Sequence, residues 1–530
     1  MSLLKANGGG LGGAGAPGGA LGSSSIYSHT INQSLRCEDG DTAWLQHTSG
    51  AASSTYTLSM WFKRGNLSTY QYLWSSGNNG IGFDVTTNRF YVWIGSGQFS
   101  TARFLDTNAW YHVTYINNSN SASVYINGVE LMSGLTGSTL STATNATNIA
   151  RYYSSGSGNY YFDGYIAEVH FVADAAKAAT DFGEFVDGVW VPKEYTGSHG
   201  SHGYYLPFDD SSAIGDDKSA NTNDFTVTDF VASDVVPDSP TNNFATYNIL
   251  VNTGQSLTYE EGNLNNSASG SFWSTSVWQQ SSLGITGGAN AGKYYFEYCT
   301  TTSGSGQATG VAVQSSRAID TVSHNDGVIY YNTAVKTGNT VTVSGISNNP
   351  TYDVLRFAFD ASNGKVWIGN STGWFNSGDP AAGTGESGTI ANYDGSVLHA
   401  VTNRTTITSD HIFNFGQDST FAGFKASGSA NGSDANGIGD FYYDPPTGFL
   451  AMCSSNLPSP VITDGSEHFT PYIYTANNAS TRSFTGLGFQ ADFLWLKPEA
   501  KHLVIDCLIV FSVFAHTPMR IEPTNQLGIH

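Results

Sequence analysis

Histidine and carboxylate side chains are the first residues of this chain to consider for chemistry. In GSHGSHG, His199 and His202 are three residues apart, a spacing that could hold a metal ion, although a lone pair in a Gly/Ser loop commonly binds nothing. Glu168 and Glu297 are isolated in strand-like patterns, whereas a glycoside hydrolase needs two carboxylates that flank the bond it cleaves. The sequence contains no His-Glu-x-x-His and no phosphate-binding glycine loop. We therefore expect the chain not to be an enzyme.

Tryptophan side chains next to Asn or Asp could instead bind a sugar. Trp374, within STGWFNSGDP, follows an expected hairpin and is the strongest candidate for ligand binding. Trp273 and Trp278, in SFWSTSVWQQ, are weaker candidates, because large aromatic residues are more often buried in a core. These three tryptophans are the predicted ligand-binding residues.

The elements that must carry these side chains are short strands. In WYHVTYINNSNSASVYINGVEL, residues 110–131, Tyr111 and Val113 alternate with His112, so they point to the opposite face of a strand. A polar turn follows, and Asn127-Gly128 tolerates the positive φ of a second tight turn. Similar runs recur along the chain with almost no helical periodicity. The sequence therefore predicts an all-β fold of tandem antiparallel β-sandwiches.

Charge limits the partners that this chain can have. Its 530 residues include 21 basic and 42 acidic side chains, for a formal net charge of −21. Phosphate backbones and anionic membranes attract basic surfaces, so we expect no nucleic acid as a partner. The apolar run LVIDCLIVFSVFA, residues 503–515, is shorter than the roughly 20 residues of a membrane-spanning helix, so we expect no membrane insertion.

The first strand-rich segment, residues 26–202, contains YTLSMWFKRG, WYHVTYINNSNSASVYINGVEL and FDGYIAEVHF in this order. The order resembles laminin-G-like, concanavalin A-like jelly-roll domains. This resemblance implies a jelly roll that binds carbohydrate or protein. Such domains often hold Ca²⁺ in a loop, and the conceivable ligands here are Asp84, Asp106 and Asp163, each of which also fits an ordinary turn.

The second strand-rich segment, residues 247–445, contains GKYYFEY and DASNGKVWIGNSTGW. It resembles the SPRY/B30.2 β-sandwich, which implies recognition through loops at one end of the sandwich rather than catalysis. Asn363-Gly364 is expected to close a hairpin, and Trp367 is expected to be buried.

Four further segments complete the expected organisation. Residues 1–25 are rich in glycine and predict a flexible tether or a docking peptide. Residues 203–246 form an Asp/Asn/Pro-rich connector, and residues 446–500 begin a third β module. Residues 501–530 depart from the pattern of the relatives that the chain resembles, and we hypothesise that this tail is read out of frame.

The order of these segments resembles large virion proteins of tailed bacteriophages, most distinctively in DDKSANTNDFTVTDF and GFLAMCSSNLPSPVI. The resemblance implies a tail fibre or adhesin on the virion surface, made in the host cytoplasm, that binds a host-surface glycan or protein receptor through sandwich loops. Its N-terminus would bind other virion proteins, and a homotrimer is an open alternative. Two other functions stay open: a capsid decoration or structural fibre protein without its own receptor, and a polysaccharide depolymerase.

Overall fold

A computed structural model of the chain describes residues 26–458 with short gaps and a few residues beyond them. The gaps are residues 49–52, 95, 120, 138, 141–145, 155–156, 252–256, 269–277, 302–306, 314–325, 347–352, 405–409 and 427–431. Beyond 458 the structure describes His468, Phe489, Phe493–Trp495 and Ile509–Phe511. The expected N-terminal tether, most of the third module and most of the aberrant tail lie outside the described residues.

The described residues form β-strands and single 3₁₀ turns, with no α-helix among them, which confirms the all-β prediction. None of these 3₁₀ turns has the length and the apolar character that crossing a bilayer requires.

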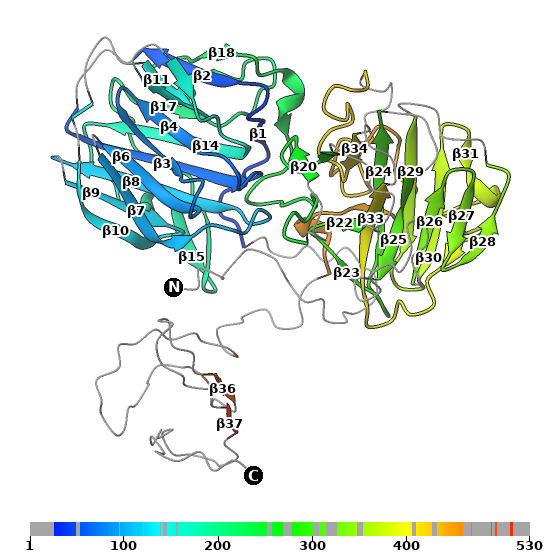
Figure 1. Ribbon diagram of the computed structural model, residues 1–530. Coiled ribbons are helices and arrows are strands. Elements are labelled where there is room, and N and C mark those ends of the chain that lie inside the picture. Colours follow the sequence, from blue (N-terminus) through cyan, green and yellow to red (C-terminus); the bar gives the residue numbers. More distant parts are fainter. Residues whose placement is uncertain are drawn as a thin grey trace. The chain divides into compact units, whose positions relative to one another are not determined.

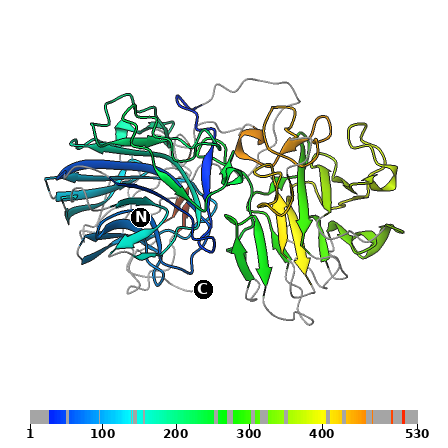
Figure 2. The ribbon, with the colours of Figure 1, turned by 90° about the horizontal axis from the view of Figure 1, so that it is seen from above.

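The first sandwich consists of two antiparallel sheets (Figure 1; Figure 2). One sheet has eight strands, in the order β10 (Val129–Thr136), β9 (Ser121–Ile126), β8 (Tyr111–Asn118), β3 (Thr55–Arg64), β14 (Gly164–Ala173), β1 (Ser34–Cys37) and β19 (Val235–Val236), with β17 (Tyr204–Leu206) also paired to β14. The other has seven, in the order β18 (Thr226–Thr228), β2 (Trp44–Thr48), β11 (Ala146–Ile149), β4 (Gln71–Ser76), β5 (Asn79–Phe83), β6 (Arg89–Ile94) and β7 (Ser96–Arg103). Two hairpins, β12 (Tyr152–Ser154) with β13 (Ser157–Asn159) and β15 (Gly183–Val186) with β16 (Val189–Pro192), and two 3₁₀ turns, η1 (Ala179–Asp181) and η2 (Ala232–Asp234), complete this part.

The predicted hairpin is strands β8 and β9. Val113 is fully buried between the sheets, whereas His112 is buried on the opposite face of β8, in contact with the ring of Trp61. Asn127 and Gly128 have φ values of 48° and 74° and connect β9 to β10, as a tight turn with two positive φ angles requires. The alternation of side chains and the Asn127-Gly128 turn are therefore confirmed.

Aromatic rings fill the space between the two sheets of the first sandwich. Phe62 of β3 lies 5.3 Å from Phe83 of β5, ring centre to ring centre. Phe171 of β14 stacks at 6.4 Å on Trp74 of β4. The burial of such large rings supplies a large apolar area per residue, which compensates for a modest apolar content.

The connector between the sandwiches contributes strands to the first one. Strands β17, β18 and β19 all lie within residues 203–246 and pair with β14, β2 and β1. The acidic loop that follows β17 closes around the carboxylate of Asp217, which accepts hydrogen bonds from the backbone N–H groups of Tyr205 and Asn223 at 2.8 and 2.9 Å. The connector is therefore largely part of the sandwich.

The second sandwich also has two sheets. The first has nine strands, in the order β20 (Leu257–Glu260), β21 (Asn265–Ala268), β34 (His411–Asn414), β24 (Lys293–Thr300), β29 (Val354–Asp360), β30 (Lys365–Asn370) and β31 (Gly373–Trp374), with β32 (Gly388–Thr389) paired to β30 and β35 (Leu450–Ala451) parallel to β24. The second has seven, in the order β22 (Trp278–Gln280), β33 (Val397–Arg404), β25 (Gln307–Val313), β26 (Gly327–Tyr331), β27 (Ala334–Thr337) and β28 (Thr340–Val343), with β23 (Ile285–Thr286) paired to β33. The 3₁₀ turns are η3 (Phe375–Ser377) and η4 (Ser454–Asn456).

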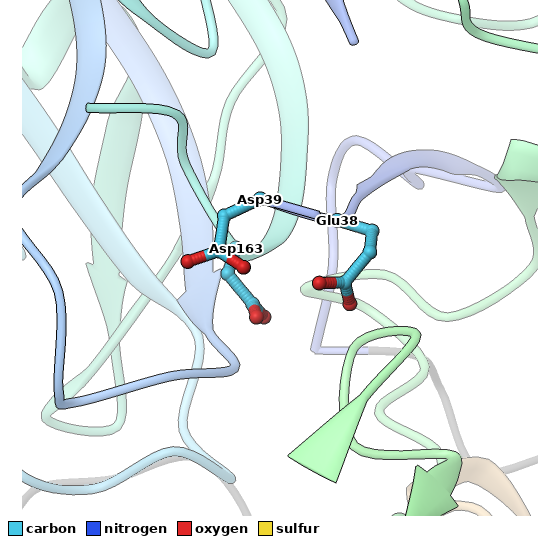
Figure 3. Close-up of side chains that lie close together, drawn as sticks. All are labelled: Glu38, Asp39 and Asp163. Carbon is cyan, nitrogen blue, oxygen red and sulfur yellow. The ribbon is translucent and has the colours of Figure 1, made fainter. Parts of the chain in front are cut away.

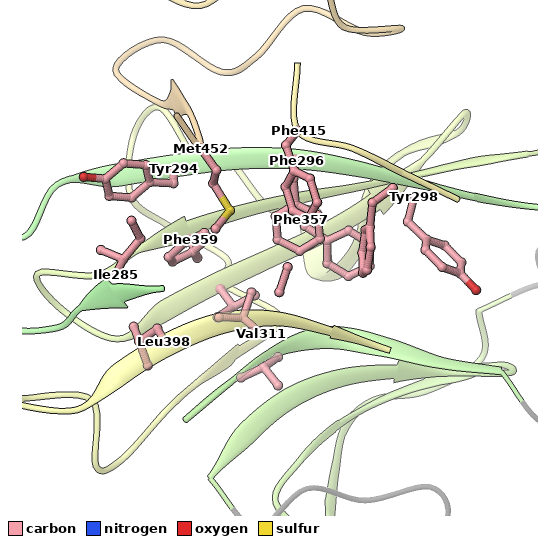
Figure 4. Packing of buried hydrophobic residues seen from close by; sticks show 14 of the residues in the cluster. Ile285, Tyr294, Phe296, Tyr298, Val311, Phe357, Phe359, Leu398, Phe415 and Met452 are labelled. Carbon is pink, nitrogen blue, oxygen red and sulfur yellow. The ribbon is translucent and has the colours of Figure 1, made fainter. Parts of the chain in front are cut away.

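Parallel phenylalanine rings lie at the centre of this second core (Figure 4). Phe296 of β24 and Phe357 of β29 are 4.8 Å apart with their planes 4° from parallel. Gly364, at φ 68°, turns the chain between β29 and β30 next to Asn363. Trp367 is fully buried and donates its indole N–H to the backbone oxygen of Thr384 at 2.8 Å. Both expectations for this hairpin are confirmed.

Buried charges join the two sandwiches. The guanidinium of Arg36, in β1, pairs with Asp418 at 2.9 Å and with Glu261 and Asp234 at 3.3 Å each. Because Arg36 is nearly inaccessible to water, its charge depends on these carboxylates from other parts of the chain.

The few described residues near the C-terminus include one strand pair. Strand β36 (Phe493–Trp495) pairs antiparallel with β37 (Ile509–Phe511).

Candidate functional site

Aromatic side chains line one face of the second sheet of the first sandwich. Tyr72 in β4 is in register with Gly82 in β5, Gly82 with Tyr91 in β6, and Tyr91 with Phe99 in β7. Residues in register across a sheet share one face, and Val92, the fully buried neighbour of Tyr91, belongs to the core face. The rings therefore point away from the core. We call the following side chains the aromatic platform: Tyr70, Tyr72, Tyr91, Trp93, Phe99, Tyr152 and Tyr160.

The rings of the platform form a continuous series. Tyr91 lies 4.7 Å from Phe99, 5.9 Å from Trp93 and 6.0 Å from Tyr72. Tyr72 in turn lies 4.7 Å from Tyr152. Phe99 and Tyr160 are each 48 % exposed, whereas Tyr72 and Tyr91 between them are buried, so the series is open to solvent only at separate points along its length.

Two of these rings pack closely against glycines of the sheet. A Cβ atom on Gly80 would lie 2.7 Å from the ring of Tyr72, and one on Gly97 would lie 2.6 Å from the ring of Tyr91. Any larger residue would lift the rings. The platform is therefore fixed before any ligand arrives.

A second candidate is a group of three carboxylates, Glu38, Asp39 and Asp163 (Figure 3). One ligand oxygen from each lies within 4.8 Å of the other two. Asp163 is 1 % exposed, its Oδ2 has no hydrogen-bond partner, and its Oδ1 packs so closely that a Cβ on Gly65 would lie 1.9 Å away. Burial raises the pKa of Glu38 to about 8 and raises that of Asp163 well above its usual range.

This group has the donors that a hard cation prefers. Ca²⁺ binds carboxylate oxygens, and the unpaired Oδ2 of Asp163 is a buried acceptor that a cation would satisfy. When bound, Ca²⁺ would replace the protons that the raised pKa values keep on Glu38 and Asp163. Glu38 already accepts the backbone N–H of Glu261 at 2.6 Å, so the group also joins the first sandwich to the start of the second.

The structure does not bring the three predicted metal ligands, Asp84, Asp106 and Asp163, together. Among the described residues, Asp163 is grouped with Glu38 and Asp39, and not with Asp84 or Asp106. The carboxylate of Asp84 accepts the N–H groups of the two threonines that follow, Thr86 and Thr87, and Asp106 accepts the N–H of Asn108 at 2.9 Å. Asp84 and Asp106 thus close turns, which is the alternative to metal binding that their sequence context also allowed.

The predicted ligand-binding tryptophans have three different placements. Trp374 is half-buried, and the guanidinium of Arg356 lies 4.7 Å from its ring centre, so one ring face is already stacked. Trp278 is 8 % exposed and packs in a cluster with Ala308 and Val401. Trp273 lies outside the described residues.

His199, one of the two histidines whose spacing was considered for a metal, belongs to a hydrogen-bonded network. His199 lies 3.1 Å from Nδ1 of His170, whose Nε2 lies 3.3 Å from Glu168. Glu168 also accepts the hydroxyl of Tyr205 at 2.8 Å and lies 3.4 Å from Nε2 of His29. Its φ of 51° and a register shift in β14 mark a β-bulge at this point. The sequence context suggested that Glu168 is isolated. The structure shows instead that it belongs to this network.

The sequence did contain a signal for the platform. Tyr91 and Trp93 alternate in RFYVWIG, and the two glycines of GIGF in β5 occupy the matching positions. Alternating aromatic residues across from glycines indicate an exposed ring face, but both strands must first be paired in register.

Three solved structures resemble parts of this fold. Domain 4 of AbnA, a GH43 extracellular arabinanase from Geobacillus stearothermophilus in complex with arabinotriose, is 21 % identical with a TM-score of 0.21, covering 25 % of this chain and 67 % of that chain. The heptameric SAP-like pentraxin of Limulus polyphemus is 13 % identical with a TM-score of 0.24, covering 28 % of this chain and 80 % of that chain. The SPRY domain of human HERC1 is 14 % identical with a TM-score of 0.24, covering 32 % of this chain and 96 % of that chain.

A comparison with curated proteins gave no match. The comparison with protein families gave one, within the first sandwich: residues 39–180 match the family described as the concanavalin A-like lectin/glucanases superfamily.

Proposed function

We propose that this chain is a non-enzymatic carbohydrate-binding protein, and that the aromatic platform of its first sandwich is the binding surface. The single observation that carries the proposal is the continuous series of ring contacts that ends at the exposed side chains of Phe99 and Tyr160. Pyranose rings present C–H groups that stack on aromatic faces, and aromatic side chains combine a large apolar area with a fixed geometry. The name of the superfamily that residues 39–180 match, which includes lectins, agrees with this function.

Several features favour binding over hydrolysis. A glycosidase needs two carboxylates on opposite sides of a glycosidic bond, and the platform consists of aromatic side chains alone. Asp163, in the acidic group, is 1 % exposed and has no room for a sugar beside Gly65. A depolymerase is the alternative function, since the superfamily is also named for glucanases.

A glycan array tests this function directly. The whole chain should bind at least one class of glycan, and Trp93→Ala and Phe99→Ala should each weaken that signal. Phe185→Ala is the matched control, because Phe185 is an exposed aromatic residue outside the platform. If both platform variants bind as tightly as the wild-type chain, the platform is not the binding surface. Release of reducing ends from a bound polysaccharide would instead establish the depolymerase.

We also propose that the glycan belongs to a host cell and that the chain is a surface protein of a tailed-bacteriophage virion. The support for this is the sequence resemblance in the connector and in the segment after residue 446. Weak binding at each site would be multiplied by several copies on one particle. Labelled chains at the tail in images of purified particles would support the adhesin, and labels on the head would support a decoration protein.

A further inference from the structure

A groove of about 530 Å³ lies on the outer face of the other sheet, at the edge formed by β8, β9 and β10. Residues 176–180, which follow β14, form its second wall. The volume is within the roughly 300–1,000 Å³ that is usual for sites of small molecules. The groove is separate from the aromatic platform, which belongs to the sheet of β4 to β7.

The groove combines one ring with many hydrogen-bonding groups. Tyr125 supplies the ring, and Lys177 supplies an ammonium group. The other polar side chains of the lining are Asn118, Ser121, Ser123, Ser133 and Thr180. No carboxylate is among the residues that line it.

The backbone of Lys177 is fixed in place. Its N–H donates to Oγ1 of Thr57 at 2.8 Å, and the same hydroxyl donates to the backbone oxygen of Ala175 at 3.1 Å. Thr57 is fully buried in β3, so this anchor belongs to the rigid sheet. The wall that carries the ammonium group is therefore preorganised.

Lys177 differs from many cations of this acidic chain. Arg36 and Lys63 are in buried ion pairs, and Lys218 and Lys365 pair with carboxylates nearer the surface. Among the described residues, no carboxylate forms an ion pair with Lys177. An unpaired ammonium group in a groove whose lining has no carboxylate would attract an anionic ligand, and the carboxylate beside the groove, Glu130, accepts the hydroxyl of Tyr125 at 3.2 Å.

We infer that this groove binds an acidic saccharide, through a salt bridge from Lys177 to the carboxylate of a uronic acid. The hydroxyls and the amide of the lining would bind sugar hydroxyls, and Tyr125 would pack against the apolar face of a sugar ring. The inference rests on the proposed function only in taking the ligands of the chain to be glycans.

Calorimetric titration with tetragalacturonate tests the inference. We expect the wild-type chain to bind it, and to bind the fully methyl-esterified tetramer, which has the same sugar backbone without the charge, about tenfold more weakly or worse. Lys177→Gln should lose about tenfold in affinity for the acid, equivalent to roughly 1.4 kcal/mol. Lys218→Gln, which removes a charge elsewhere on the surface, should bind like wild type.

Equal binding of acid and ester would overturn the inference, as would unchanged binding by Lys177→Gln or no binding by the wild-type chain. Loss of acid binding in Trp93→Ala with no change in Lys177→Gln would overturn it too, because the acid would then bind at the platform. The proposed function is judged separately, by the array signal of the Trp93 and Phe99 variants.

Discussion

The indole N–H of Trp190 donates a hydrogen bond to Nδ1 of His112 across 3.2 Å, on the outer face of the first sandwich. The other ring nitrogen of His112 lies 2.8 Å from Oγ of Ser59. Because Nδ1 accepts, the proton of the neutral ring is on Nε2 and is donated to Ser59. Burial lowers the pKa of His112 to about 3, so the ring stays neutral at physiological pH.

Replacing Trp190 by Phe should destabilise the chain by about 1–3 kcal/mol, because the variant keeps an aromatic ring but leaves Nδ1 of His112 buried without a donor. Urea denaturation followed by circular dichroism measures this difference. Phe185→Leu, at an exposed neighbouring ring, serves as the control. A Trp190→Phe chain as stable as wild type would show that the hydrogen bond contributes nothing.

Replacing Gly97 by Ala should weaken glycan binding and leave the fold intact. The added Cβ would meet the ring of Tyr91 at 2.6 Å and tilt it out of the platform. A loss of about 1 kcal/mol, or roughly fivefold in affinity, is the expected size. Ser96→Ala, one residue earlier in β7, is the control, and wild-type affinity in Gly97→Ala would mean that the position of the Tyr91 ring is unimportant for binding.

Calcium should raise the melting temperature of the chain, and more at pH 8 than at pH 6. Burial raises the pKa of Glu38 from 4.5 to about 8, so without metal the folded chain holds this proton while the unfolded chain releases it. The stability that the protonated group contributes is present below pH 4.5 and is lost as the pH rises toward 8. Bound Ca²⁺ would restore the stability that is lost as the pH rises, because it takes the place of the proton on Glu38. Its stabilising effect should therefore be larger at pH 8 than at pH 6.

Scanning calorimetry with and without Ca²⁺ checks this expectation. Asp163→Asn should abolish the response, whereas Asp84→Asn should keep it, since Asp84 serves only its own turn. A full calcium response in Asp163→Asn would exclude the carboxylate group as the metal site.

Glu168→Gln should make the chain less sensitive to acid. Burial alone would raise the pKa of Glu168, but hydrogen bonds from His170 and His29 lower it from 4.5 to about 2. The folded state therefore binds fewer protons than the unfolded state in this window, and stability is present above pH 4.5 and lost as the pH falls toward 2. Unfolding free energies at several pH values should fall less steeply in the variant.

Glu184, which is half-buried and accepts the hydroxyl of Ser28 outside this network, gives the control, because Glu184→Gln should keep the wild-type slope. An unchanged slope in Glu168→Gln would mean that the network does not govern acid stability.

The hairpin around His112 could be predicted because its pattern is local. A period of two residues sets which side chains enter the core, and Asn127-Gly128 sets the turn. Trp367 could be placed for the same reason, since both strands of its hairpin are adjacent in sequence. The three strands within the connector were harder to foresee, because their partners β14, β2 and β1 are distant in the chain.

The candidate sites were harder to predict, because their residues are even farther apart along the sequence. Glu38 and Asp163 are 125 positions apart, and only the pairing of β1 with β14 brings them together. The platform needs four strands in register before Tyr72 and Phe99 share a face. Lys177 enters a groove whose opposite wall is a hairpin some 50 residues earlier. No single stretch of sequence contains any of these arrangements.

The ion pairs of Arg36 have a consequence for how such modules could be exchanged. A first sandwich cut from its neighbour would keep the guanidinium but lose Asp418 and Glu261, two of the carboxylates that neutralise it. Recombination between related genes would then succeed only when the junction residues travel together. The two sandwiches should accordingly melt in a single transition and be inherited as one unit.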